Sequence, residues 1–341
     1  MAPIEADPEV AGTALACPAC GQELVQLECP GCRRRFGSLA GIPDLRLEDV
    51  KYEIGEDLLA ARELQAASEE GDFEGLLKVH WASTNRPAAL SERFLAAELA
   101  APGRSAAYLR EIETARGKTL STNDRFLEVG CGTAALAVAA AGRGAEVTAG
   151  DLSMRRLVLA RKRLNEAGAA GALLICAAGE RLPFPAGSFT VVAGADVIEH
   201  VADQELFVRE CHRVLEPGGL LFLSTPNRFS LSLEPHVRLW GVGFLPHALA
   251  VRYVRRARPR GVPYDQVRLR SAAGLRRLLE PCGFEVDVVA PEVPPATAGI
   301  YSGLELRLVR AYNQFRHLPG ARPLLRAVGP FFHVFARKRR A

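Results

Sequence analysis

Short apolar runs alternate along the chain with longer segments in which apolar residues recur every three or four positions. The short runs fit buried strands, and the longer spacing fits amphipathic helices. We predict strands at residues 125–129, 145–150, 172–177, 189–195, 219–225, 284–290 and 331–337. We predict helices at residues 133–142, 153–167, 203–215 and 271–282. This alternation indicates an α/β fold, a doubly wound, mostly parallel seven-stranded sheet with helices on both faces.

Helical spacing also covers residues 50–116, ahead of the first predicted strand. We therefore divide the chain into a small module at 1–47, a helical linker or lid at 48–120 and an α/β domain at 121–341. The linker is either a scaffold between domains or a lid that closes over a ligand. Its segment "KVHWAST" (Lys78 to Thr84) puts a His beside a Trp and is a candidate ligand contact.

The C-terminal part adds an amphipathic helix at 303–316, a second short helix and the last strand. We expect that strand to insert antiparallel between the fifth and sixth strands. Apolar and Arg residues alternate in the helices, which fits either peripheral contact with a membrane or packing against the sheet. We favour packing.

Composition narrows the class of protein. With 48% hydrophobic and 24% charged residues in 341, the chain is typical of globular proteins. We find no apolar run long enough to span a membrane and no secretory signal in "MAPIEADPEV", so we expect a cytoplasmic protein with reduced thiols. Residues 228–341 hold 20 Lys and Arg against 7 Asp and Glu, whereas the remainder holds 23 against 32. This basic third fits phosphate or membrane binding, or an Arg-rich composition without a ligand.

Four of the eight cysteines lie in "CPACGQELVQLECPGC" as Cys17, Cys20, Cys29 and Cys32. Each C-x-x-C pair can wrap a turn around one metal ion, and two such turns complete a tetrahedral thiolate site. We predict a structural, non-catalytic Zn²⁺; a redox pair or two disulfides are the alternatives. The other four cysteines are isolated, and we expect them to be packing residues.

The run Gly130-Cys131-Gly132-Thr133-Ala134-Ala135 follows the strand at 125–129. A dinucleotide fingerprint has a third glycine, where this chain has Ala135, and that difference decides little. More telling is Glu128, because a carboxylate beside the loop would repel a pyrophosphate and suits a cationic ligand. Asp151 ends the next strand, where its carboxylate can accept hydrogen bonds from both ribose hydroxyls. S-adenosylmethionine, a sulfonium and ammonium compound without phosphate, fits both acids.

The segments "LEVGCGTA", "VTAGDLSMRRLVLA", "GERLPFPAGSFTVV" and "ADVIEHVADQELFVRECHRVLEPGGLLFLSTPN" closely resemble the motifs of class I S-adenosylmethionine-dependent methyltransferases. The resemblance covers about residues 120–290 and is nearest to the ubiquinone-biosynthesis group. It implies that the cofactor is bound by Glu128, Gly130, Cys131, Gly132, Asp151, Leu152, Ala178, Gly179 and Ala195. Residues 17–47 in turn resemble zinc-ribbon modules that precede or partner some methyltransferases and end in a turn like Gly41 to Leu45.

The chain departs from that group at two places. An Asp that reaches the adenine amine in the group is Ala178 here, and the triplet Ser-Phe-Asp is Ser188-Phe189-Thr190. The first change removes one hydrogen bond to the base, about 1 kcal/mol. Backbone groups near Ala178 and Gly179 remain available to read the base.

Methyl transfer to a hydroxyl needs alignment of the acceptor and a general base. The candidate base is His200 in "VIEHV", with Glu199 as its orienter or as a substrate contact; His200 instead capping a helix or packing on the cofactor is the alternative. The insertion at 226–270 is a candidate acceptor pocket or a solvated basic cap. Its candidate residues are the pair His236 and Trp240, with Arg238 and Arg268 for an acidic acceptor.

These residues are compatible with three alternative functions. The first is a methyltransferase acting, at oxygen, on a small molecule, a glycan or a lipid intermediate. The second is an RNA methyltransferase that grips RNA with the zinc ribbon and the basic third. Against it, Ala195-Asp196-Val197-Ile198 stands where an Asn-Pro-Pro-Tyr-type amine site would follow the fourth strand. The third is a non-enzymatic binder with a vestigial fold, which failure to bind the cofactor would favour.

Overall fold

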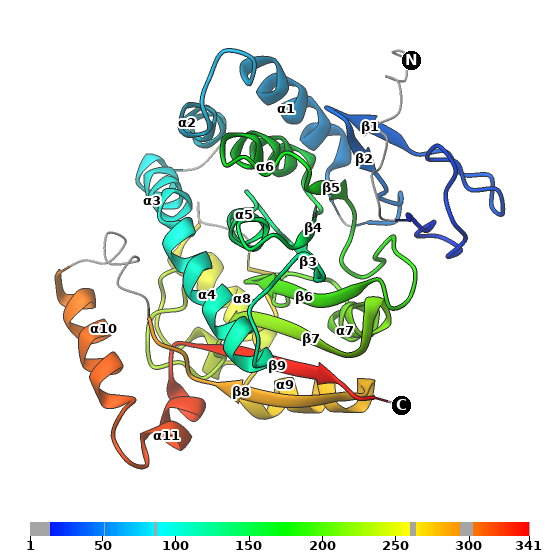
Figure 1. Cartoon of the computed structure of the whole chain (residues 1–341). Coiled ribbons are helices and arrows are strands. Elements are labelled where there is room, and N and C mark those ends of the chain that lie inside the picture. Colours follow the sequence, from blue (N-terminus) through cyan, green and yellow to red (C-terminus); the bar gives the residue numbers. More distant parts are fainter. Residues whose placement is uncertain (1–13, 51, 85–86, 260–263, 294–302, 341) are drawn as a thin grey trace.

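The protein forms one nine-stranded sheet in the order β1-β2-β5-β4-β3-β6-β7-β9-β8 (Figure 1). The computed structural model describes residues 14–50, 52–84, 87–259, 264–293 and 303–340. The strands are β1 (Gly37–Leu39), β2 (Ile42–Asp44), β3 (Arg125–Val129), β4 (Glu146–Asp151), β5 (Leu173–Cys176), β6 (Phe189–Ala195), β7 (Leu215–Pro226), β8 (Phe284–Val289) and β9 (Phe331–Lys338). Parts of the predicted N-terminal module, lid and insertion, at 1–13, 51, 85–86 and 260–263, lie outside the described residues.

Helices connect and cover these strands (Figure 1). They are α1 (Ile54–Ala67), α2 (Phe73–Ser83), α3 (Ala88–Leu99), α4 (Ala101–Arg116), α5 (Ala135–Ala141), α6 (Met154–Glu166), α7 (Gln204–Val214), α8 (His247–Ala257), α9 (Ala272–Leu279), α10 (Gly303–Phe315) and α11 (Ala321–Val328). Two short 3₁₀ turns lie at Val242–Phe244 and Glu280–Cys282. None of the helices in the described ranges combines the length and the apolar character needed to cross a membrane.

The prediction of a doubly wound, mostly parallel sheet is confirmed. Strands β5, β4, β3, β6 and β7 run parallel, and β9 inserts antiparallel between β7 and β8 as expected. All seven predicted strands are present, and most of their limits agree within about two residues. The main difference is β7, which begins at Leu215 instead of residue 219, because the chain passes directly from α7 into the strand.

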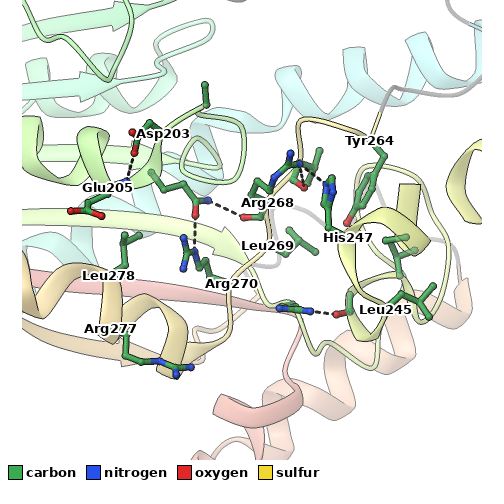
Figure 2. A pocket seen from close by; sticks show the side chains of 17 residues that line it. Asp203, Glu205, Leu245, His247, Tyr264, Arg268, Leu269, Arg270, Arg277 and Leu278 are labelled. Carbon is green, nitrogen blue, oxygen red and sulfur yellow. Dashed lines mark hydrogen bonds between the residues drawn. The ribbon is translucent and has the colours of Figure 1, made fainter. Parts of the chain in front are cut away.

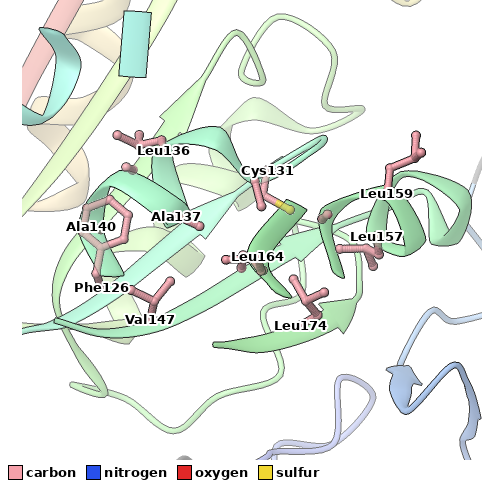
Figure 3. Close-up of a cluster of buried hydrophobic side chains, with 14 of the residues drawn as sticks. Phe126, Cys131, Leu136, Ala137, Ala140, Val147, Leu157, Leu159, Leu164 and Leu174 are labelled. Atoms are coloured by element: carbon pink, nitrogen blue, oxygen red, sulfur yellow. The ribbon is translucent and has the colours of Figure 1, made fainter. Parts of the chain in front are cut away.

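Side chains alternate between two buried cores on opposite faces of the sheet. On β3, Phe126 belongs to the core under α4, α5 and α6, whereas Leu127 and Val129 belong to the core under α7 and α9. Figure 3 shows the first core, in which Leu136 and Leu157 from two helices approach strand residues. A strand buried on both faces explains the continuous apolar runs in the sequence.

The N-terminal module is joined to this sheet, which the sequence did not predict. Strand β2 pairs parallel with β5 through Asp44 and Cys176, and β1 pairs antiparallel with β2. Leu15 and Leu45 pack into the core under α7 and α9. The boundary drawn at residue 47 therefore separates two sequence patterns but not two independent sheets.

The insertion between β7 and α9 has a small core of its own. It consists of Val237, Val242, Ala250, Val254, Tyr264 and Val267. Because these side chains bury one another, the insertion is a structured cap at the carboxyl edge of the sheet.

Helices α10 and α11 lie on the other side of the molecule from β1 and β2 (Figure 1).

Candidate functional site

The loop that follows β3 requires its two glycines. Gly130 has a φ of 68° and Gly132 a φ of 53°, in the left-handed region that favours glycine. A Cβ atom on Gly130 would lie 2.5 Å from Cγ2 of Val197, and one on Gly132 would lie 2.9 Å from Nη2 of Arg156. Both positions therefore need glycine, and the loop lies at the edge where parallel sheets bind ligands.

Two carboxylates flank this loop, the buried Glu128 and the half-buried Asp151. Oε2 of Glu128 accepts a hydrogen bond of 2.8 Å from the amide of Ala137, and Oδ2 and Oδ1 of Asp151 accept bonds of 2.8 Å from the amides of Gly132 and Ser153. Burial raises the pKa of Glu128 to about 8 and raises the pKa of Asp151. In the described part of the chain, neither carboxylate forms an ion pair with a Lys, Arg or His side chain. Two such acids fit a ligand that brings its own positive charge and hydroxyl groups.

The other predicted cofactor residues lie at the same edge. The amide of Cys131 donates to a carbonyl oxygen of β4 at 3.0 Å, which ties the loop to that strand. Leu152 follows β4, Ala178 and Gly179 follow β5, and Ala195 ends β6. A Cβ on Gly179 would lie 2.8 Å from an aromatic ring on α7, so this position also needs glycine. The residues present therefore fit S-adenosylmethionine, and their individual roles stay predictions.

Helix α3 reaches over the glycine loop, a contact that the sequence did not reveal. Oγ1 of Thr133 donates a bond of 2.6 Å to Oε2 of Glu98, and the guanidinium of Arg156 pairs with Oε1 of the same residue. Arg163 donates to Oγ1 of Thr133 at 2.7 Å and to the carbonyl of Glu98 at 2.9 Å. These bonds fix the end of α3 against the loop, as a lid would require.

The His80 and Trp81 pair, the candidate ligand contact of the linker, lies inside the helical segment. Both residues are buried, and Trp81 stacks on Phe94 of α3 with ring centroids 5.0 Å apart. The guanidinium of Arg156 lies 5.9 Å from the Trp81 ring centroid. These side chains hold the lid helices together beside the loop.

His200 lies just beyond β6 and meets a residue of the insertion. Its Nε2 is 3.0 Å from Nε2 of His236, whose Nδ1 is 2.5 Å from Oε1 of the buried Glu234. Burial and the neighbouring His236 lower the pKa of His200 to about 4, whereas Glu234 raises the pKa of His236. His200 is therefore neutral at neutral pH, and a proton taken up by the pair rests on His236.

Glu199 completes this cluster. It is fully buried, and burial raises its pKa to about 8. Oε2 accepts a bond of 2.9 Å from Thr225, whereas Oε1 has no hydrogen-bond partner among the described residues. One ligand atom each from Glu199, His200 and His236 lies within 4.8 Å of the others. A carboxylate with two imidazoles suits a divalent cation as well as a shared proton.

The candidate residues of the insertion lie apart from one another. Trp240 is 59% exposed and donates from Nε1 to the carbonyl of Leu231. His236 instead faces His200, because the cap folds back over the end of β6. Among the described residues, those that line the neighbouring cavity include Arg268 but not Arg238.

Asp196 and Glu234 are site residues that the sequence reading left unassigned. Asp196 holds a φ of 56°, rare for a residue other than glycine, and Oδ1 accepts a bond of 3.0 Å from Ser224. Such strained backbone concentrates at functional sites. The segment "ADVIEHV" contains Asp196 within a motif, but nothing in it signals the strain.

The four N-terminal cysteines converge as predicted. Sγ of Cys17 is 3.6 Å from Sγ of Cys32, and Sγ of Cys20 is 3.3 Å from Sγ of Cys29. All four are free thiols whose sulfur atoms lie within 4.8 Å of one another. Four thiolates around one point fit a tetrahedral metal site.

Comparisons with known proteins show similarity to methyltransferases. A family model described as a methyltransferase domain matches residues 127–223. A ubiquinone biosynthesis O-methyltransferase of Thiobacillus denitrificans is 32% identical over 184 residues, 52% of this chain and 74% of that protein. The protein of the same name from Pseudomonas aeruginosa is 32% identical over 174 residues, 51% of this chain and 70% of that protein. The structure of Haemonchus contortus phosphoethanolamine N-methyltransferase 2 with S-adenosyl-L-methionine aligns with a TM-score of 0.45 at 17% identity; the match covers 68% of this chain and about half, 52%, of that one.

Proposed function

Because this chain belongs to the class I S-adenosylmethionine-dependent methyltransferases, we propose that it transfers a methyl group to an oxygen atom of a small-molecule acceptor. The observation that carries the proposal is the contact between His200 and His236, which puts a neutral imidazole beside the end of β6. The relatives named O-methyltransferases support oxygen as the acceptor atom. The acceptors considered under this proposal include glycans and lipid intermediates.

The glycine loop and its two acids bind the cofactor in this proposal. When bound, S-adenosylmethionine supplies an electrophilic methyl group on a positively charged sulfur. Glu128 attracts the amino end of the ligand, and Asp151 accepts hydrogen bonds from its ribose hydroxyls. Contact of Glu98 with Thr133 and Arg156 closes α3 over the same loop and excludes water.

His200 accepts the acceptor's proton. His200 is neutral and can take that proton on Nδ1, while its Nε2–H donates to Nε2 of His236, whose Nδ1–H donates to Glu234. Proton transfer through the pair moves positive charge toward the buried carboxylate of Glu234. Such positioned acid–base groups typically contribute 10²–10⁴-fold in rate.

The test is transfer of an isotope-labelled methyl group to extracts of the source cell, with the product identified by mass spectrometry. Label on the oxygen of a small molecule supports the proposal, and label retained in RNA or on nitrogen overturns it. Assays with EDTA, followed by added Mg²⁺ or Zn²⁺, separate two roles of the histidine cluster. Activity lost in EDTA and restored by Mg²⁺ alone would assign Glu199, His200 and His236 to metal binding instead of a shared proton, whereas restoration by Zn²⁺ alone would be explained by refilling the cysteine site.

We further propose that Cys17, Cys20, Cys29 and Cys32 bind one structural Zn²⁺. Convergence of their sulfur atoms supports this. All four positions of a tetrahedral ion would be filled by protein, so this ion would have no catalytic position. Elemental analysis that finds no zinc in purified protein would contradict it.

A further inference from the structure

A cavity of about 720 Å³ lies between the start of α7, the insertion and α9 (Figure 2). This is within the usual size of small-molecule sites. Ala202, two residues after His200, belongs to its lining, and the amide of Arg268 donates to the carbonyl of Glu199 at 2.8 Å. The cavity therefore adjoins the histidine cluster on the side that the insertion covers.

Four arginine residues line this cavity: Arg228, Arg268, Arg270 and Arg277. In the described residues their hydrogen-bond partners are neutral. Arg228 donates to the carbonyl of Gly243 at 3.0 Å, Arg270 to Oε1 of Gln204 at 2.6 Å, and Arg277 to a carbonyl of its own helix at 3.3 Å. Arg268 contacts backbone carbonyls and the ring of His247. None of the four forms an ion pair within the described ranges.

The carboxylates on the rim are already engaged elsewhere. Oδ1 of Asp203 caps α7 by accepting from the amides of Glu205 and Leu206, each at 3.0 Å. The carboxylate of Glu205 pairs with Arg209 at 2.6 Å. Burial and the nearby Arg268 lower the pKa of His247, so it adds no charge at neutral pH. The cavity lining thus holds four arginines against the two carboxylates of Asp203 and Glu205, and its net charge is positive.

We propose that this cavity binds a phosphate-bearing group of the methyl acceptor, an inference that rests on the proposed function. Guanidinium groups present paired N–H donors that match phosphate oxygens, and several together suit a phosphomonoester or diphosphate. Figure 2 shows Arg270, Arg277 and Leu278 toward one end and His247, Tyr264 and Leu245 toward the other. The apolar side chains receive the part of the acceptor that carries the phosphate.

Calorimetric titration of pyrophosphate into the full chain at low ionic strength tests this site without requiring turnover. Arg277→Gln and Arg268→Gln should each weaken binding at least tenfold. Arg276→Gln is the matched control, because Arg276 lies next to Arg277 on α9 but faces Glu280 and Asp287. Its affinity should stay within twofold of the unmodified protein. Thermal melting of each variant verifies that it is folded.

Pyrophosphate that does not bind, or that binds the Arg277→Gln and Arg268→Gln proteins as well as the unmodified one, overturns the proposal. Binding to vesicles with and without phosphatidic acid distinguishes a lipid headgroup from a soluble phosphate ester. Either source agrees with phosphate binding in the cavity. Titration of S-adenosylmethionine into the same samples separates the two proposals. Failure with pyrophosphate while the cofactor binds rejects only the cavity assignment, whereas failure of the cofactor to bind rejects the proposed function.

Discussion

Arg46 and Asp57 form an enclosed ion pair between the N-terminal module and α1, with Nη1 and Oδ2 2.8 Å apart. The same Nη1 donates to the carbonyl of Leu152 at 3.1 Å, and Asp57 accepts from the amide of Met154 at 2.7 Å. Oγ of Ser153 donates to its other oxygen at 2.8 Å. The pair therefore fixes the turn that follows Asp151, the residue we expect to hold the ribose.

Asp57→Asn should destabilise the protein by about 2 kcal/mol, because the amide nitrogen cannot accept one of the hydrogen bonds that the buried carboxylate accepts, although Arg46 keeps its ion pair with Asp44. Denaturant unfolding measures the change. Glu74→Gln is the control, since its pair with Lys78 is exposed and should contribute nothing measurable. Equal denaturant midpoints for the two variants would show that the contacts between Arg46 and Asp57 do not stabilise the fold.

Asp151→Asn should raise the dissociation constant for S-adenosylmethionine at least tenfold. The amide keeps the size of the side chain, but its nitrogen cannot accept a hydrogen bond from a ribose hydroxyl or from the amide of Gly132. Calorimetry measures the affinity. Glu146→Gln, exposed at the other end of β4, should bind S-adenosylmethionine as the unmodified protein does. An unchanged dissociation constant in the Asp151 variant would show that Asp151 does not bind the ribose.

Binding of S-adenosylmethionine should release a proton near neutral pH. Burial raises the pKa of Glu128 to about 8, so its carboxyl group is mostly protonated in the free protein below that pH. A cationic ligand favours the ionised form, so affinity should rise as pH increases from 6 to 8. The binding enthalpy should then depend on the ionisation enthalpy of the buffer. Glu128→Gln should lose part of that dependence, and an identical dependence would assign the proton to another group.

The α/β core was predictable because its signals are local. Apolar runs such as residues 125–129 and the glycines at 130 and 132 specify a strand and a tight turn without reference to distant residues. Strands β1 and β2 gave no such signal, since three residues are too few for a period. Their pairing is tertiary, made through Asp44 and Cys176.

The acids and glycines of the cofactor site were predictable for the same reason, whereas its closure was not. Glu98 and Thr133 are 35 residues apart, and His200 and His236 are 36 apart, with no periodic pattern linking either pair. The insertion reads from its sequence only as rich in Arg, Pro and aromatic residues. Which of its side chains face the sheet is decided by its own small core.

Removing zinc should loosen the N-terminal module and leave the rest of the sheet folded. Structural zinc sites contribute about 10–16 kcal/mol of folding free energy, and β2 is joined to β5 at one residue pair. Hydrogen exchange after chelation should show lost protection in residues 14–45 only. Cys32→Ser should reduce bound zinc well below one ion per chain, and Cys282→Ser, an isolated cysteine, should not. Full protection after chelation would contradict the zinc site.

His236→Gln should lower kcat about 10²-fold, the lower end of what a positioned acid–base group contributes. Loss of His236 removes the ring that takes the proton on from His200, while the glycine loop and both acids of the proposed cofactor site stay intact. The dissociation constant of S-adenosylmethionine should therefore be unchanged.

Glu234→Gln should give a smaller loss of kcat, because His236 then loses the carboxylate that raises its pKa and the activity profile shifts to lower pH. Trp240→Phe tests whether any substitution in the cap lowers kcat, since Trp240 is exposed and lies four residues after His236 in the sequence. Normal turnover in the His236 variant, with the product still methylated at oxygen, would exclude the pair from catalysis.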